Sequence, residues 1–273
     1  VPAEVTLASG QRHHFYHKVG ESLHRAVALR DARDLIVRTT AGSQENVNLV
    51  VDGSVHLAIA QWETIPQSEE ISIVAPLFLD KVHFVVKQGS NIRSLEDLEG
   101  RNVSLGLPNS GMRLTSERIL RVCDVDASTI GEKDRSFEDL LTLPQMEAAI
   151  VTTSSSNPVL HGLLADSRFQ LIKFSLEQIE KLLQTGYRRD RLISRDFPDL
   201  VGPAGIPTIS TMAFLITHVD SSDALVESTL HALYDEIDSE SVVSKLGLIK
   251  RPLAREFSVR FHPSAAHFYS LEK

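Results

Sequence analysis

The chain has 273 residues, of which 42% are hydrophobic and 23% are charged, so it can form one large or two medium domains with a substantial core. Its 28 basic and 36 acidic side chains give a formal net charge of −8 without any basic run, which argues against nucleic acid as a partner. Cys123 is the single cysteine, so an internal disulfide and a thiolate metal site are excluded.

The first residues of the chain lack the pattern of a signal peptide. No uninterrupted apolar run reaches the ~20 residues that span a bilayer. If the protein is exported, we expect its targeting segment to be absent from this chain. The cysteine content leaves the compartment open, because many exported bacterial proteins carry no disulfide.

Strand-like and helical segments alternate along the first part of the chain. Apolar runs predict strands at 5–8, 34–38 and 55–60, and the spacing of apolar residues predicts helices at 19–28 and 47–53. This βαβαβ order is typical of half of a mononucleotide-binding fold. Two further strands are expected, at 71–76 and 82–87.

The same alternation restarts in the second part of the chain. Capping residues and apolar spacing predict helices after Ser94, at 112–122, after Ser136, at 157–164 and from 220 to about 237. Strands are expected at 101–106, 148–152, 169–174 and 209–217. The chain is therefore expected to be an α/β protein with two lobes.

The segment 39–46, with the sequence TTAGSQEN, joins a strand to a helix through a Gly/Ser turn. The first amides of a helix have no carbonyl one turn earlier to bond to, so such a turn can receive an anion. Gly42 and Ser43 would then bind a ligand. The alternative is an ordinary loop in which Ser43 only caps the helix.

A second turn of this kind precedes the helix at 112–122, where Ser110 and Gly111 follow a predicted strand. Ligands of open α/β sheets bind outside the carboxyl ends of the strands, where both turns are expected. Two such corners facing one cleft would suit a ligand with one or two carboxylates.

Several blocks of the chain resemble the TAXI family, the solute-binding receptors of one class of TRAP transporters. The TTAGSQEN segment resembles the family signature TTxGSxEN, and 50–61 is similar to a family segment that ends in Gln. Residues 92–106 are similar to the segment IKSLADLKGKKVSVG, which many type II periplasmic binding proteins share. Ser110 and Gly111 match the GPPGSGT loop, and 261–269 resembles the terminal HPGAxxYY.

The resemblance implies a bilobal type II periplasmic binding protein fold, with two α/β domains joined by two hinge strands and a ligand cleft between them. Domain 1 would comprise 1–84 and 213–273, and domain 2 would comprise 85–212, with crossovers near 82–87 and 208–217. The implied function is an extracytoplasmic receptor that binds a small carboxylate, such as glutamate or a related dicarboxylate, and delivers it to TRAP membrane subunits. We expect a monomer without a cofactor or catalytic residues.

The expected ligand-binding residues come from both corners and their surroundings. In the first lobe, Asn46, Gln61 and Tyr16 would orient the ligand, and Trp62 would either line the cleft or belong to the core. Gln61 has the alternative of pairing with loop backbone. In the second lobe the loop continues with Met112 and Arg113, where the family has threonine. Arg113 could pair with a carboxylate, or it could be a solvated arginine.

The segment before the first helix departs most from the family. Where the family has GGTYY, the chain has His13, His14, Phe15, Tyr16 and His17. Glycine permits close backbone approach, so a bulkier pocket mouth is expected. The histidines could also bind a metal, but no HExxH arrangement or further ligand follows from the spacing, so loop or pocket roles are favoured. Phe197, where the family often has tyrosine, removes a hydroxyl.

Two other function classes were weighed against the receptor. An enzyme is disfavoured because the sequence lacks a GxSxG elbow, a phosphate loop and paired carboxylates in a motif. Cys123, near the end of a predicted helix, is expected to be buried rather than nucleophilic. The second alternative is a sensing or interaction module that keeps the receptor fold without serving transport.

Overall fold

The computed structural model describes residues 4–31, 34–65, 69–235, 241–254 and 259–270. The chain divides into two compact units: unit 1 comprises Val1–Phe78 and Met212–Lys273, and unit 2 comprises Leu79–Thr211. Both passages between the units fall inside strands, β4 (Ile71–Lys87) and β9 (Ile206–His218). The sequence predicted two strands at 71–76 and 82–87, but β4 is one continuous strand, so no turn interrupts it.

Unit 1 contains a mostly parallel sheet. Strands β1 (Glu4–Ala8), β2 (Asp34–Arg38) and β3 (Leu57–Gln61) pair in the order β2-β1-β3, and all three run parallel. The last residues of β9 pair antiparallel with β3. The predicted strand–helix alternation of this unit is confirmed, and the predicted strand at 55–60 begins and ends slightly later, at 57–61.

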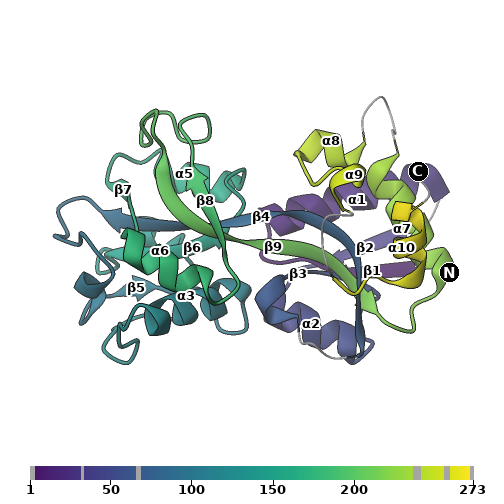
Figure 1. Cartoon of the computed structure of the whole chain (residues 1–273), viewed down its shortest axis with the longest axis horizontal. Helices are drawn as coiled ribbons and strands as arrows, with labels where there is room; N and C mark the ends of the chain where they lie inside the picture. The colour runs from purple at the N-terminus through teal and green to yellow at the C-terminus, as the bar shows by residue number, and fades with distance from the viewer. Residues whose placement is uncertain (1–3, 32–33, 66–68, 236–240, 255–258, 271–273) are drawn as a thin grey trace. The chain divides into compact units, whose positions relative to one another are not determined.

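The two helices that connect these strands cover opposite faces of the sheet (Figure 1). The apolar stripe of α1 (Phe15–Asp31) packs in the main core of the unit with β-strand residues such as Leu7 and Ile59. Helix α2 (Ser43–Val51) contacts β3, and its buried Val47 and Val50 lie outside that core.

Helix α1 begins at Phe15, four residues before the predicted start. Phe15 is buried, with its ring 4.8 Å from that of Phe78, and it extends the stripe of Val19 and Leu23 by one turn. Tertiary packing thus starts the helix earlier than local pattern indicated. Tyr16 and His17 consequently lie in the first turn of a helix rather than in a loop.

The carboxyl-terminal part of unit 1 packs as short helices around α7 (Asp223–Tyr234), which Ser222 caps. These are α8 (Val242–Leu246), α9 (Arg251–Ala254) and α10 (Pro263–Ser270). His262 donates from Nε2 to the Ser221 carbonyl at 3.0 Å, and the Tyr269 hydroxyl donates to the Val74 carbonyl at 3.1 Å. The block 261–269 therefore anchors α10. The predicted helix end near 237 lies outside the described residues.

Unit 2 is built around β6 (Ala148–Thr153). Strand β5 (Val103–Ser104) pairs parallel with β6, and β4 pairs antiparallel with it. Strand β7 (Phe169–Ile172) pairs with β4, and β8 (Arg188–Leu192) pairs with β9. The strand predicted at 101–106 is shorter in the structure, where β5 comprises only two residues.

The helices of unit 2 also lie on both faces of its sheet (Figure 1). Helix α3 (Gly111–Val122) shares a core with Ile150, whereas α5 (Pro158–Leu164) shares a different core with Ala149 and Val151. Since neighbouring residues of β6 face opposite ways, the two helices cover opposite faces. The other helices are η2 (Glu96–Leu98), a 3-10 turn, with α4 (Asp139–Thr142) and α6 (Leu176–Leu183).

Candidate functional site

The connectivity of each unit creates a topological switch point at the carboxyl ends of its parallel strands. In unit 1, the order β2-β1-β3 places a topological switch point between β1 and β3. In unit 2, β5 and β6 are adjacent and parallel, but α3 and α5 leave them for opposite faces. Switch points are where open α/β sheets bind ligands, and each predicted corner lies at one.

Asn46 holds the switch point of unit 1 together. Its Nδ2 donates to the carbonyl of Ser9 at the end of β1 (2.6 Å) and to that of Ile59 in β3 (2.7 Å), while its Oδ1 accepts from the Thr40 hydroxyl (2.6 Å). The side chain is fully buried. Its amide therefore joins the ends of two strands and a loop, and the expected contact of Asn46 with a ligand stays a prediction.

The other polar side chains of the TTAGSQEN segment are also used within the corner. Ser43 Oγ accepts the backbone N–H of Gln61 at 3.1 Å, and Glu45 Oε2 accepts that of Ala41 at 2.7 Å. Gly42, not Ser43, is the N-cap of α2, and its φ of 135° suits glycine. No side chain caps α2 among the described residues. The amides of Ser43 and Gln44 are thus the groups this corner can offer an anion.

The remaining unit 1 candidates differ in exposure. Gln61 is buried at the end of β3, and its carbonyl accepts the Thr64 hydroxyl at 2.7 Å. Trp62 follows in the 3-10 helix η1 (Trp62–Thr64), with its side chain 39% exposed and its ring edge-on to Phe214. Tyr16 is half-buried, edge-on to Phe78. Trp62 is therefore the most accessible aromatic group close to this switch point.

The histidines that precede and begin α1 do not assemble a metal site. His17 is buried, with Nδ1 3.1 Å from Ser9 Oγ and Nε2 3.4 Å from a carboxylate oxygen of Glu21. His13 adopts a left-handed φ of 71° in the preceding loop. Within the described ranges, no three His, Cys, Asp or Glu side chains form a group that could hold a metal ion.

The second corner is closed by its own serine. Ser110 caps α3: its Oγ accepts from the Arg113 amide at 3.0 Å and donates to the Leu107 carbonyl at 2.7 Å. Gly106 lies against this turn with a φ of 99°, and a Cβ there would be 2.9 Å from the Arg113 amide nitrogen. The Ser110 hydroxyl thus donates within the turn, and its expected bond to a ligand stays a prediction. The amides of Gly111 and Met112 are the groups that this turn can offer an anion.

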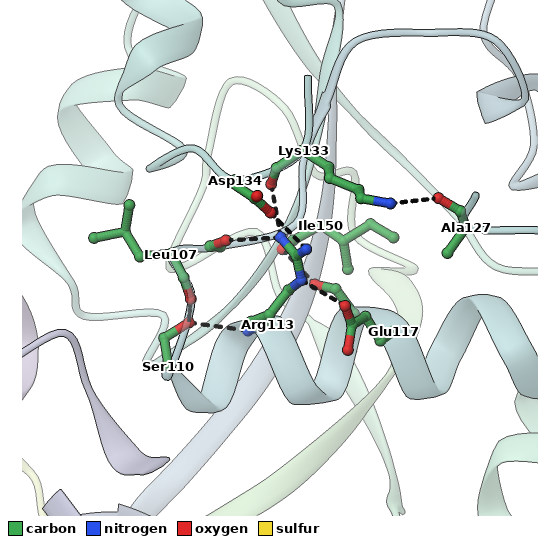
Figure 2. Close-up of polar contacts among 10 residues, drawn as sticks. Leu107, Ser110, Arg113, Glu117, Ala127, Lys133, Asp134 and Ile150 are labelled. Carbon is green, nitrogen blue, oxygen red and sulfur yellow. Dashed lines mark hydrogen bonds and ion pairs between the residues drawn. The ribbon is translucent and has the colours of Figure 1, made fainter. Parts of the chain in front are cut away.

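Arg113 holds the loop that packs beside α3 (Figure 2). Its guanidinium lies 2.6 Å from Glu117 and 2.5 Å from Asp134, and it donates to the carbonyls of Gly106 and Lys133. Although burial lowers the pKa of Arg113, its bonds to Glu117 and Asp134 raise that pKa above the ordinary value. Two carboxylates of the protein thus already neutralise the Arg113 guanidinium, and its expected pairing with a ligand carboxylate stays a prediction.

The loop after β6 is a polar element at the carboxyl end of this strand that the sequence pattern did not predict. Burial lowers the pKa of His83 to about 4, so the imidazole is neutral near pH 7. Its Nδ1 donates to the Val151 carbonyl (3.3 Å), so Nε2 accepts from the Ser155 hydroxyl (3.2 Å). Asn157 donates to Thr153 Oγ1 and caps α5. The run of five Ser and Thr residues before Asn157 was the available signal.

Cys123 is buried, as predicted, and burial raises the pKa of its thiol to about 11. The folded protein therefore keeps the thiol protonated below that pH, and a protonated thiol is a poor nucleophile. We expect native protein at pH 8 to react with iodoacetamide far more slowly than urea-unfolded protein, as measured by intact mass. Equal rates in the two states would contradict this assignment and reopen a role for the thiol.

Comparisons with known proteins agree with this architecture. A family model described as the NMT1-like family matches residues 7–272. MatC from Rhodopseudomonas palustris, solved with bound malate, superimposes with a TM-score of 0.62 at 14% identity, covering 100% of this chain and 97% of MatC. The Escherichia coli periplasmic aliphatic sulphonate binding protein SsuA gives a TM-score of 0.51 at 13% identity, covering 85% and 72% of the two chains.

A regulatory protein shares the fold as well. A sulfate-bound mutant of the OxyR2 regulatory domain from Vibrio vulnificus gives a TM-score of 0.53 at 13% identity, covering 89% of this chain and 95% of that domain. The chain thus has the α/β fold of periplasmic binding proteins, which receptors and regulators share. No helix in the described ranges combines the length and apolar character needed to cross a membrane.

Proposed function

The chain belongs to the NMT1-like family, and on that premise we propose that it is an extracytoplasmic solute receptor of the TAXI type. It binds a small carboxylate, such as glutamate or a related dicarboxylate, and delivers it to the membrane subunits of a TRAP transporter. It acts as a monomer and returns its ligand unchanged. The resemblance of the TTAGSQEN segment and the terminal block to TAXI receptors supports the family assignment, and malate-bound MatC shares the fold.

The observation that carries this proposal is the uncapped start of α2 at a switch point. Thr40, Ser43, Glu45 and Asn46 all bond within the corner, so they fix the backbone around the first amides of the helix. The helix dipole adds about half a positive charge at this end. A ligand carboxylate that accepts from the Ser43 and Gln44 amides would supply the missing cap.

The charge of the corners favours a carboxylate group, which carries one negative charge, over a doubly charged group such as sulfate. The basic side chain at the start of α3, Arg113, is neutralised by Glu117 and Asp134, and the first turn of α2 carries Glu45. The attraction then comes from amide dipoles, which suit a single negative charge. Each charge-assisted bond contributes about 2 kcal/mol.

A thermal-shift screen tests the proposal, because a ligand that binds only folded protein raises the unfolding midpoint by mass action. We expect L-glutamate, malate or succinate to raise the midpoint in a concentration-dependent way, while sulfate and taurine at equal ionic strength do not. A shift with sulfate or taurine alone would contradict a carboxylate receptor.

A pair of substitutions at Ser43 tests the amide corner directly. Ser43→Ala removes only the hydroxyl that accepts from Gln61, whereas Ser43→Pro also removes the amide at the first helical position, which proline tolerates. We expect Ser43→Pro to bind the carboxylate at least about tenfold more weakly than Ser43→Ala, as measured by calorimetry. Equal affinities of the two variants would remove this amide from the site.

A second candidate function is a ligand-sensing module, which the structural similarity to the OxyR2 regulatory domain supports. Such a module would bind solute without serving transport. A gene for a large membrane permease next to this one would favour the receptor. Fusion of the same fold to a signalling domain would favour the sensor.

A further inference from the structure

Two buried hydroxyl groups in unit 2 lack hydrogen-bond partners. Thr115 is fully buried and Thr152 is 5% exposed. Neither Oγ1 atom has a hydrogen-bond partner in the part of the chain that the structure describes. Burying a hydroxyl without a hydrogen-bond partner costs free energy, so unpartnered buried hydroxyls in a folded protein call for an explanation.

Both hydroxyls belong to the interface between α3 and β6. Thr152 lies two residues after Ile150, so its side chain shares the face of β6 that α3 covers. Ser116 donates to the Ile150 carbonyl at 3.2 Å, which fixes the level of α3 along the strand. Thr152 is further toward the carboxyl end of β6, at the level of the start of α3.

Thr115 points to the same place from the helix. It follows Gly111 by four residues, so it lies one turn further along the face of α3 that packs on the sheet. The amides of Gly111 and Met112 open the helix, since the first bonds to Ser110 come from Arg113 and Leu114. The amides of Gly111 and Met112 and the hydroxyls of Thr115 and Thr152 thus belong to the part of the α3–β6 interface near the carboxyl end of β6.

We propose that the start of α3, together with Thr152 and Thr115, binds a carboxylate group of the solute within unit 2. The proposal rests on the proposed function and adds Thr152 as a residue that determines ligand class. A carboxylate oxygen accepts one bond from an amide of Gly111 or Met112 and one from the Thr152 hydroxyl. No cation takes part, because Arg113 is neutralised by Glu117 and Asp134.

Thr152→Val tests the proposal, because valine keeps the shape of threonine and removes the hydroxyl. We expect the affinity for malate or L-glutamate, whichever wild type binds, to fall at least about tenfold in calorimetric titrations. The unfolding midpoint without ligand should stay unchanged or rise, since an unpartnered buried hydroxyl is removed. Thr152→Ser should retain most of the affinity.

Thr229→Val is the matched control. Thr229 is a buried threonine of α7 in unit 1, and its hydroxyl donates to the Leu225 carbonyl at 2.8 Å. We expect this variant to lower the midpoint without ligand and to bind ligand like wild type. Thr152→Val should thus lower the affinity and not the midpoint, whereas Thr229→Val should lower the midpoint and not the affinity. This contrast separates a ligand role from a structural one.

The outcomes distinguish this inference from the function on which it rests. If wild type binds malate or L-glutamate and Thr152→Val binds equally well, the inference is wrong and the receptor function stands. A Thr152→Val variant with a lower midpoint and an unchanged affinity would show a structural role and also overturn the inference. If wild type binds no carboxylate, both proposals fail.

Discussion

Replacing Asn46 with alanine is expected to lower the free energy of unfolding by about 3 to 5 kcal/mol. The substitution removes three hydrogen bonds and leaves the carbonyls of Ser9 and Ile59 without these partners inside the protein. An unsatisfied buried group costs its full desolvation penalty, so the loss exceeds that of three average bonds. Urea unfolding followed by circular dichroism measures the change.

Asn48→Ala provides the control for this result. Asn48 lies in the same helix with its side chain exposed, so its replacement should change the free energy of unfolding by at most about 0.5 kcal/mol. If Asn46→Ala were as stable as Asn48→Ala but bound ligand more weakly, Asn46 would be a ligand residue after all. The structural role assigned to it would then be wrong.

Replacing Arg113 with methionine is expected to lower the free energy of unfolding by about 2 to 4 kcal/mol. Methionine keeps much of the apolar stem, but it leaves Glu117 and Asp134 without their shared cation and removes one donor each from the carbonyls of Gly106 and Lys133. Arg113→Lys should recover only part of the loss, because an ammonium cannot reproduce the planar fork of the guanidinium. Urea unfolding measures both variants.

Arg168→Met separates this network from an ordinary surface pair. Arg168 bonds to Asp166, but its side chain is 53% exposed, and exposed ion pairs contribute little to stability. If Arg113→Met cost no more than Arg168→Met and instead weakened carboxylate binding, the guanidinium would serve the ligand. The start of α3 would then offer a cation to the ligand, and its inferred preference for a carboxylate group over doubly charged sulfate would be wrong.

Local pattern was sufficient for most strands and for the start of α3. Apolar runs bounded by turn residues predicted β2 and β6, and the Ser110–Gly111 turn predicted the start of α3 to within one residue. The family resemblance agreed with the periplasmic binding protein fold that the similar structures share. Several elements were missed, including β8, because its residues are mostly charged, α6, although Ser175 and Gln178 form a capping box, and the short helices α8, α9 and α10.

The roles of Asn46 and Ser43 depended on contacts far along the chain. Asn46 bonds to residues 37 and 13 positions away, and Ser43 accepts an amide 18 positions away. A local reading of a Gly/Ser turn cannot tell a side chain that meets a ligand from one that meets a distant strand. Arg113 shows the same limit, since Asp134 lies in a loop without helical or strand pattern.

Isothermal titration calorimetry of wild-type protein with L-glutamate and with malate tests the central claim most directly. The account predicts saturable binding of at least one of them with one ligand per chain, which weakens in Ser43→Pro relative to Ser43→Ala. Absence of binding heat from both carboxylates, together with saturable binding of sulfate or a sulfonate, would contradict it.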